Sequence, residues 1–485
     1  MTHTVEKIGG TSIANTDVIL NNVLIRGLTG DALYNRIFVV SAYAGMTDML
    51  LEHKKSGKPG VYGLFAGAES KWAWSDAITA IGEAMTAKNQ EVFGDHSDCE
   101  TADAFVRERI EGVRNCLIDL HRLCSYGQFR LDEHLITVRE MLSALGEAHS
   151  AHNTALLLRQ KGVNAQFVDL TGWRDERDLC LDERIREGLD KIDLSRELPI
   201  VTGYASASEG MVETYDRGYT EVTFSHVAVV TEADEAVIHK EFHLSSADPK
   251  LVGEDKVIKI GRTNYDVADQ LSNMGMEAVH PAAAKGLRQA GIPLRVKNTF
   301  DPEDAGTVID GDYVSETPRA EIVTGIKNIV ALELFEQDMV GVKGYDAEAL
   351  RLLTRHGVRI VTKCSNANTI IHYVEGTRKA VKRVVADLEE SFPNARVNLV
   401  EVAIVSVIGS DLALPGLTAR AATALNAAGV EVKGIHQLMR DIDLQIIIDE
   451  DSFDDAVRAL HACLVEEYSP QEAGEVACGE LRSVA

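Results

Sequence analysis

Short apolar runs alternate with helical stretches through residues 1–312. The runs have the length of buried strands and lie at 4–8, 36–42, 166–169, 198–204, 236–239 and 293–297. Between about residues 72 and 131 the pattern is helical and polar. Strands separated by helices predict a mostly parallel sheet covered on both faces. Ligands of such sheets bind at the carboxyl ends of the strands, so we expect chemistry in the loops that follow these runs.

Beyond about residue 324 the pattern becomes a repeat. It predicts strand, helix, strand, strand and helix at 329–334, 347–356, 357–361, 369–374 and 377–392, and again at 402–407, 416–428, 429–432, 443–448 and from 453 onward. Two successive β-α-β-β-α units predict two small domains of one design, at 322–395 and 400–468, before a C-terminal tail at 469–485. Because such units expose sheet edges, we expect a homodimer or a higher homo-oligomer.

Charge and cysteine content narrow the class of protein. The 485 residues carry 75 Asp plus Glu against 49 Lys plus Arg, a net charge of −26. Such a surface repels nucleic acid and anionic membranes, so we expect neither as a partner. The seven cysteines form no C-x-x-C pair, which favours reduced thiols over disulfides or zinc. No apolar run has the length of a membrane span or the setting of a signal peptide, so we expect a soluble, cytoplasmic protein.

The start of the chain carries the strongest candidate site. A half-apolar strand leads into Lys7-Ile8-Gly9-Gly10-Thr11-Ser12. Glycines let backbone N–H groups approach an anion closely, and a lysine adds a mobile charge of the kind that binds phosphates. Taken alone, the pattern fits a purely structural interpretation equally well, in which a strand ends in a Gly-Gly turn and the lysine is solvated. No Walker A pattern is present, which excludes a P-loop nucleotide site.

Six motifs in order resemble those of aspartokinases. They are K-I-G-G-T-S at 7–12, V-V-S-A at 39–42 with G-M-T-D at 45–48, L-G-E at 145–147 with Ser143 and Ser150, D-R-G-Y-T-E at 216–221, A-D-P-K at 247–250, and H-P-A at 280–282 with N-T-F at 298–300 and A-G-T at 305–307. The paired C-terminal units resemble the tandem ACT domains of the same family. The acidic charge and looser loops resemble the branch associated with ectoine synthesis.

The resemblance implies a fold and a reaction. The fold is an amino-acid-kinase (carbamate-kinase-like) three-layer α/β/α sandwich over residues 1–312, followed by two ACT-like α+β domains. The reaction converts ATP and L-aspartate into ADP and 4-phospho-L-aspartate, with Mg²⁺ accompanying ATP, as the first step of the aspartate-family or ectoine pathway. The ACT units imply an amino-acid effector.

The resemblance also implies roles for individual residues. Lys7, Glu147 and Arg217 would be catalytic. The ATP and phosphate positions are Lys7, Gly9, Gly10, Thr11, Ser12, Lys240, Ser245 and Lys250, and the substrate positions are Ser41, Thr47, Glu147, Arg217 and Thr220. No side chain is assigned to a metal. An effector would contact Gln337, Asp338, Gly341, Ser410 and Asp411, unless the ACT units serve assembly alone.

The chemistry of phosphoryl transfer to a carboxylate requires the same residue types. Phosphate and carboxylate repel by about 4 kcal/mol per unit-charge pair at ~4 Å and an effective dielectric near 20, so cations must neutralise them. The nucleophile is already an ionised carboxylate and needs no general base. Arg217 suits the α-carboxylate of an amino acid, and Glu147 suits its α-ammonium. From spacing alone, Arg217 also fits a surface ion pair, and Glu147 an exposed helix acid.

Several positions depart from the family pattern. Tyr219 replaces a glycine and Glu221 an aspartate in the G-R-G-G-S-D loop, His239-Lys240-Glu241 replaces W-T-D, and Glu277 replaces a lysine. These changes leave two alternatives open. One is a catalytically weakened amino-acid sensor that works through its ACT units. The other is a kinase of the same fold for another acidic amino acid, such as glutamate.

Overall fold

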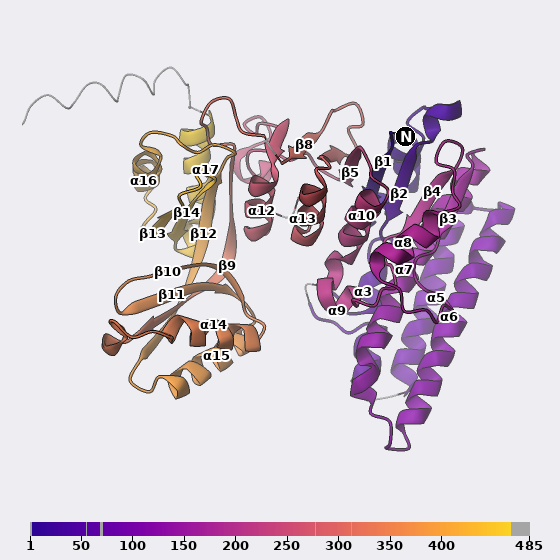
Figure 1. The fold of residues 1–485 in the computed structure, drawn as a ribbon, viewed down its shortest axis with the longest axis horizontal. Coiled ribbons are helices and arrows are strands. Elements are labelled where there is room, and N and C mark those ends of the chain that lie inside the picture. Colours follow the sequence, from indigo (N-terminus) through magenta and orange to yellow (C-terminus); the bar gives the residue numbers. More distant parts are fainter. Residues whose placement is uncertain (1, 55, 68–70, 277, 312, 467–485) are drawn as a thin grey trace, which may run out of the picture. The chain divides into compact units, whose positions relative to one another are not determined.

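The computed structural model describes residues 2–54, 56–67, 71–276, 278–311 and 313–466. The chain forms two compact units (Figure 1). Unit 1 comprises Met1–Leu244 and Val279–Gly311, and unit 2 comprises Ser245–Ala278 and Asp312–Ala485. The grouping of 245–278 with the C-terminal half has no counterpart in the hydropathy pattern. The predicted tail at 469–485 and Glu277 lie outside the described residues.

Unit 1 is built on the predicted parallel sheet. Its strands follow the order β3-β4-β2-β1-β5-β7-β8, parallel from β3 to β7, with β8 antiparallel to β7. Their bounds are β1 Thr4–Ile8, β2 Arg36–Val40, β3 Ala165–Val168, β4 Leu198–Thr202, β5 Glu235–Lys240, β7 Leu294–Asn298 and β8 Thr307–Asp310. The predicted strands are confirmed, and their predicted ends lie within two residues of the observed ends. The central β2 and β4 are buried at every position, as expected of strands covered on both faces.

Helices surround this sheet. They are α1 Gly10–Ala14, α2 Thr16–Ile19, α3 Met46–Leu50, α4 Val61–Ala66, α5 Lys71–Phe93, α6 Ser97–Cys124, α7 Leu135–Gln160, α8 Leu181–Leu189, α9 Met211–Tyr215, α10 Tyr219–Val230 and α13 Pro281–Ala290. The long helices α5, α6 and α7 lie side by side (Figure 1). On α5 the buried residues Trp74, Ile78, Ile81 and Met85 recur every three or four positions and form one apolar face of the core.

Unit 2 contains one antiparallel sheet in the order β10-β11-β9-β12-β14-β13. Its strands are β9 Ile322–Phe335, β10 Arg359–Ser365, β11 Thr369–Glu375, β12 Arg396–Ile408, β13 Val432–Gln437 and β14 Asp443–Ile448. Its helices are α14 Tyr345–Arg355, α15 Arg378–Ser391, α16 Leu417–Ala427 and α17 Phe453–His461. The segment 245–278 contributes α11 Pro249–Val252, β6 Arg262–Asn264 and α12 Tyr265–Asn273.

The two predicted repeats share this sheet. Strands β9 and β12 run through two separate cores, because Val323 and Val405 pack in one while Leu334 and Val397 pack in or against the other. The strand predicted at 429–432 is displaced and begins at Val432. Gly429, with φ +73°, is part of the turn that ends α16, so strand pairing starts later. The domain boundaries 322–395 and 400–468 stay a prediction.

Candidate active site

The glycine turn after β1 is shaped by a neighbouring loop. A Cβ on Gly10 would lie 2.6 Å from the carbonyl oxygen of Ala42, in the loop after β2. The N–H of Ala44 donates to the carbonyl of Gly10 at 3.1 Å. The first two strand-end loops therefore touch through their backbones, and a side chain at position 10 would force them apart. This contact accounts for Gly10 without reference to a ligand.

Lys7 points from β1 to a buried carboxylate. Its Nζ lies 3.1 Å from Oε1 of Glu221, and the Nζ of Lys240, at the end of β5, lies 3.5 Å from the same oxygen. Oε2 of Glu221 accepts the backbone N–H of His280. Burial alone would raise the pKa of Glu221, but Lys7 and Lys240 lower it to about 2. Two ammonium groups thus converge on one ionised acid.

The two hydroxyl residues of the turn differ from each other in burial. The side chain of Thr11 is exposed, whereas Ser12 is fully buried. The Ser12 hydroxyl donates to Oε1 of Glu241 at 2.7 Å and lies 3.3 Å from the hydroxyl of Thr299. Because its hydroxyl is engaged inside unit 1, Ser12 would offer a phosphate its backbone N–H. The phosphate roles of Gly9, Gly10, Thr11 and Ser12 stay predictions.

Glu147 lies on α7 and is almost fully buried, not an exposed helix acid. The hydroxyl of Thr220 donates to its Oε1 at 2.6 Å, while Oε2 has no hydrogen-bond partner among the described residues. Gly203, just after β4, leaves room for it, since a Cβ there would lie 2.6 Å from Oε2. Burial raises the pKa of Glu147 to about 8, against the opposing effects of Thr220 and Lys7. An arriving ammonium group would ionise this carboxyl and complete its hydrogen bonding.

Arg217 lies just before α10 and is held by two acidic residues. Its Nη1 donates to Oδ1 of Asp48 at 2.5 Å, and its Nη2 donates to the backbone carbonyl of Glu52. The Glu52 carboxylate is held in turn by Arg139 at 2.7 and 2.8 Å. Asp48 lies on α3 directly after Thr47, so the predicted carboxylate receptor is held beside the short helix that carries one predicted hydroxyl donor.

Comparison with known proteins identifies the family. Residues 3–298 match the model of the amino acid kinase family, and residues 405–464 match an ACT domain. The chain is 51% identical over 474 residues to the aspartate kinase Ask_Ect of Stutzerimonas stutzeri. This match covers 98% of this chain and 99% of that protein. The chain belongs to the aspartate kinase family. More distant matches include aspartokinase 3 of Arabidopsis thaliana chloroplasts, 23% identical over 98% of this chain and 84% of that protein.

Solved structures agree on the fold of this aspartate kinase. A crystal structure of Escherichia coli aspartokinase III in complex with lysine and aspartate matches with a TM-score of 0.71 at 19% identity, covering 96% of this chain and 99% of that one. The aspartate kinase of Clostridium acetobutylicum matches with a TM-score of 0.68 at 19% identity, covering 95% and 100%. At these identities the likeness shows the fold, which is the predicted amino-acid kinase with ACT units.

Tyr219 fits the loop of this aspartate kinase without strain. It begins α10 with φ −56°, a helical value that any residue adopts, and its buried ring packs edge-on against Tyr204 with centroids 5.6 Å apart. Close approach occurs one residue earlier, because a Cβ on Gly218 would lie 2.3 Å from the ring of His280. The tyrosine therefore replaces a glycine at a position where the backbone does not require one.

Several supporting residues of the kinase site were not predicted. Glu140 on α7 accepts hydrogen bonds from the Tyr204 hydroxyl at 2.7 Å and from the N–H of Val212 at 2.7 Å.

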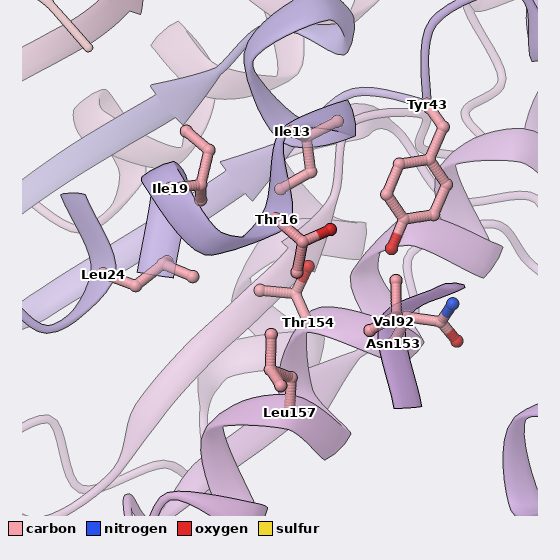
Figure 2. A pocket seen from close by; sticks show the side chains of 9 residues that line it. All are labelled: Ile13, Thr16, Ile19, Leu24, Tyr43, Val92, Asn153, Thr154 and Leu157. Carbon is pink, nitrogen blue, oxygen red and sulfur yellow. The ribbon is translucent and has the colours of Figure 1, made fainter. Parts of the chain in front are cut away.

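Behind the glycine turn lies a small cavity of about 10 Å³, drawn in Figure 2. Thr16 and Asn153 face it, and each has an oxygen without a hydrogen-bond partner in the described part of the chain. This volume and these partners suit a single buried water.

Ser41 follows β2 in unit 1, and the other remaining predicted positions belong to unit 2. Ser245 is buried and its hydroxyl donates to the carbonyl of Ala247, while Lys250 lies in α11 and is exposed. Among the predicted effector residues, Gln337 and Asp338 are exposed in the short 3₁₀ turn after β9. Ser410 differs, because its hydroxyl is buried and donates to Glu321 at 2.8 Å. The effector roles of these residues, and of Gly341 and Asp411, stay predictions.

No helix in the described segments is long and apolar enough to cross a bilayer.

Proposed function

We propose that this chain transfers the γ-phosphoryl group of MgATP to the β-carboxylate of L-aspartate. The observation that carries the proposal is the pairing of two receptors at the start of α10. Thr220 contacts the buried Glu147, whose second oxygen has no hydrogen-bond partner among the residues that the structure describes, and Arg217 lies three residues earlier. A buried acid and a half-buried guanidinium so placed suit the α-ammonium and α-carboxylate of one amino acid. Ser41 and Thr47 would add hydroxyl donors.

The phosphate side supplies charge rather than proton transfer. The γ-phosphorus–oxygen bond to ADP breaks with its electron pair on the ADP oxygen, and a carboxylate oxygen of aspartate forms the new bond to phosphorus. No proton moves, so a general base is not needed. Lys7, beside Gly9, would neutralise the transferred group. Ser245 and Lys250 are further predicted nucleotide positions.

In the proposed reaction, Mg²⁺ binds together with the nucleotide. Mg²⁺ is commonly held by substrate phosphates, water and one or two carboxylates. Glu221, the acid beside Lys7, has both oxygens occupied by ammonium groups and the His280 N–H, so it is not an obvious metal ligand. The cationic donor set therefore fits phosphates that arrive with their own Mg²⁺, which would lower their charge.

Unit 2 would serve assembly and regulation. The ACT match supports a homodimer or a higher homo-oligomer, with an amino acid as the effector. Sedimentation of the full chain with and without lysine or threonine would test both points. The 51% identity to Ask_Ect supports the expectation of the ectoine branch over general aspartate-family synthesis.

The test traps the acyl phosphate with hydroxylamine in the presence of MgATP and either L-aspartate or L-glutamate. We expect hydroxamate with aspartate alone. Glu147→Gln and Arg217→Ala should raise the KM for aspartate, and Lys7→Ala should abolish turnover while the fold is kept. Product from glutamate alone would favour the other-substrate alternative. No product from either, together with a thermal shift on adding an amino acid, would favour the sensor.

A further inference from the structure

The carboxylate of Glu140, on α7, binds groups of unit 1 that lie far from it in the sequence. Its Oε2 accepts the Tyr204 hydroxyl at 2.7 Å. Its Oε1 accepts the backbone N–H groups of Val212 at 2.7 Å and of Glu213 at 3.2 Å. Val212 and Glu213 lie in the first turn of α9, where N–H groups have no partner within the helix itself. Glu140 therefore satisfies these N–H groups and fixes the start of α9 to α7.

This anchor lies on the same helix as the predicted ammonium receptor. Glu140 precedes Glu147 by about two turns of α7, so the two side chains leave one face of the helix about 10 Å apart. Oε1 of Glu147 accepts the Thr220 hydroxyl at 2.6 Å. Helix α7 thus holds the chain at Val212 and again at Thr220, once on each side of Arg217.

The chain between these two anchors carries the predicted carboxylate receptor. Helix α9 leads directly into the 3₁₀ turn Asp216–Gly218, of which Arg217 is the middle residue. The Arg217 guanidinium contacts Asp48 and the backbone of Glu52, which belong to α3 and the loop after it. Because these side-chain contacts do not involve α7, the distance from Arg217 to Glu147 depends on the two backbone anchors.

The Tyr204 ring extends the anchor to α10. It packs edge-on against Tyr219, the first residue of α10, with centroids 5.6 Å apart, and both rings are buried. Burial and the neighbouring Glu140 carboxylate raise the pKa of Tyr204 well above its ordinary value, so the hydroxyl keeps its proton and donates it to Glu140. One carboxylate thereby fixes residues before and after Arg217.

We propose that Glu140 is a positioning residue for aspartate binding, which sets the distance between Arg217 and Glu147 by fixing α9 and Tyr204 to α7. This inference rests on the proposed kinase function and adds to it a residue that acts through Arg217. The α-ammonium and α-carboxylate of an amino acid are bonded to one carbon, so their receptors must keep one spacing. A displacement of about 1 Å in such a site can cost about 10²-fold in activity.

The test compares Glu140→Leu, Glu140→Gln and a matched control, Glu183→Leu. Leucine accepts no hydrogen bond, whereas glutamine can still accept from Val212 and donate to Tyr204. Glu183 accepts the N–H of Cys180 at 3.1 Å at the start of α8, so its replacement removes the same kind of contact elsewhere in unit 1. We would measure kcat, the KM for aspartate and for MgATP, and the melting temperature of the full chain.

We expect Glu140→Leu to raise the KM for aspartate by about tenfold or more, while kcat and the KM for MgATP change by less than about threefold. Glu140→Gln should recover most of this loss. Glu183→Leu should lower the melting temperature and leave the KM for aspartate unchanged. Because Glu140 acts through Arg217, Glu140→Leu should lower kcat/KM for aspartate by less than about twofold in an Arg217→Ala background.

A structural role alone would lower the melting temperature and leave the KM for aspartate unchanged, or would lower kcat/KM by one factor with and without Arg217. Either result would overturn the proposal. If Glu140→Leu does not fold, Tyr204→Phe removes one of the three hydrogen bonds and should raise the KM for aspartate by about threefold, again only when Arg217 is present. An unchanged KM in that variant would overturn the proposal equally. Failure of the kinase function is seen separately, as a wild-type chain that forms no aspartyl hydroxamate.

Discussion

Arg217 and Asp48 form an ion pair in which Nη1 lies 2.5 Å from Oδ1. The guanidinium expected to receive the α-carboxylate of aspartate thus already binds a carboxylate of the protein. Its side chain is 17% exposed and that of Asp48 is 29% exposed. A substrate must either displace Asp48 or share Arg217 with it, so Asp48 tunes how tightly the substrate binds.

Asp48→Asn should lower the KM for aspartate. Partly exposed ion pairs contribute about 0.2–1 kcal/mol, so release of Arg217 from this pair corresponds to up to about a fivefold gain. Steady-state kinetics at saturating MgATP measure it. Asp132→Asn, which breaks the exposed pair with Arg130, is the control and should leave KM unchanged. A higher KM in Asp48→Asn would show that Asp48 orients Arg217 for the substrate instead.

Glu147 should make aspartate binding pH-dependent. Its pKa, raised to about 8 mainly by burial, keeps the empty site protonated at neutral pH, whereas a bound ammonium favours the carboxylate. The KM for aspartate should therefore fall by up to about tenfold per unit as pH rises toward 8, and level off above it. Glu147→Gln should bind aspartate weakly and lose this slope. A wild-type KM that is flat between pH 6 and 8.5 would contradict the assignment.

Glu221 should stabilise unit 1 in a pH-dependent way. Burial raises its pKa, but Lys7 and Lys240 more than offset this and bring it to about 2, below the ordinary 4.5. Ionised Glu221 therefore stabilises the fold above about pH 4.5, and this contribution is lost as pH falls toward 2. Glu221→Gln should lower the free energy of unfolding by about 3 kcal/mol at pH 7 and by much less at pH 3. Urea unfolding at the two pH values measures the difference, and a constant gap would contradict it.

The strands and the glycine turn were predictable because their signals are local. A run such as Ile37–Val40 is apolar because both faces of β2 are covered, and Gly10 marks a close backbone approach. The partners of the site residues were not predictable. Asp48 and Arg217 lie 169 residues apart, and nothing in either segment indicates the other. Burial of Glu147 likewise depends on packing of α7 from both sides, which a single helix pattern does not reveal.

A chain of three polar side chains in unit 2, of which Ser246 and His461 are buried, was equally invisible in the sequence. Ser246 Oγ lies 2.8 Å from Nε2 of His461, and Nδ1 of His461 lies 2.9 Å from Oε1 of Glu466. Serine, histidine and carboxylate in this order resemble a hydrolase triad. Ser246 is fully buried, however, and its hydroxyl also accepts the N–H of Ile258 at 2.9 Å. The chain of contacts therefore joins the segment 245–278 to α17 and does not expose a nucleophile.

His461→Leu should destabilise unit 2 because it leaves Ser246 and Glu466 without their shared partner. We expect a loss of about 2–3 kcal/mol in the free energy of unfolding, with faster hydrogen exchange at the Ile258 amide. His356→Leu is the matched control, since His356 is half-buried and, among the described residues, pairs with Asp387. It should lose about 1 kcal/mol or less and leave the Ile258 amide protected. Equal losses in the two variants, or an unchanged Ile258 amide in His461→Leu, would show that α17 is held to this segment by its apolar contacts.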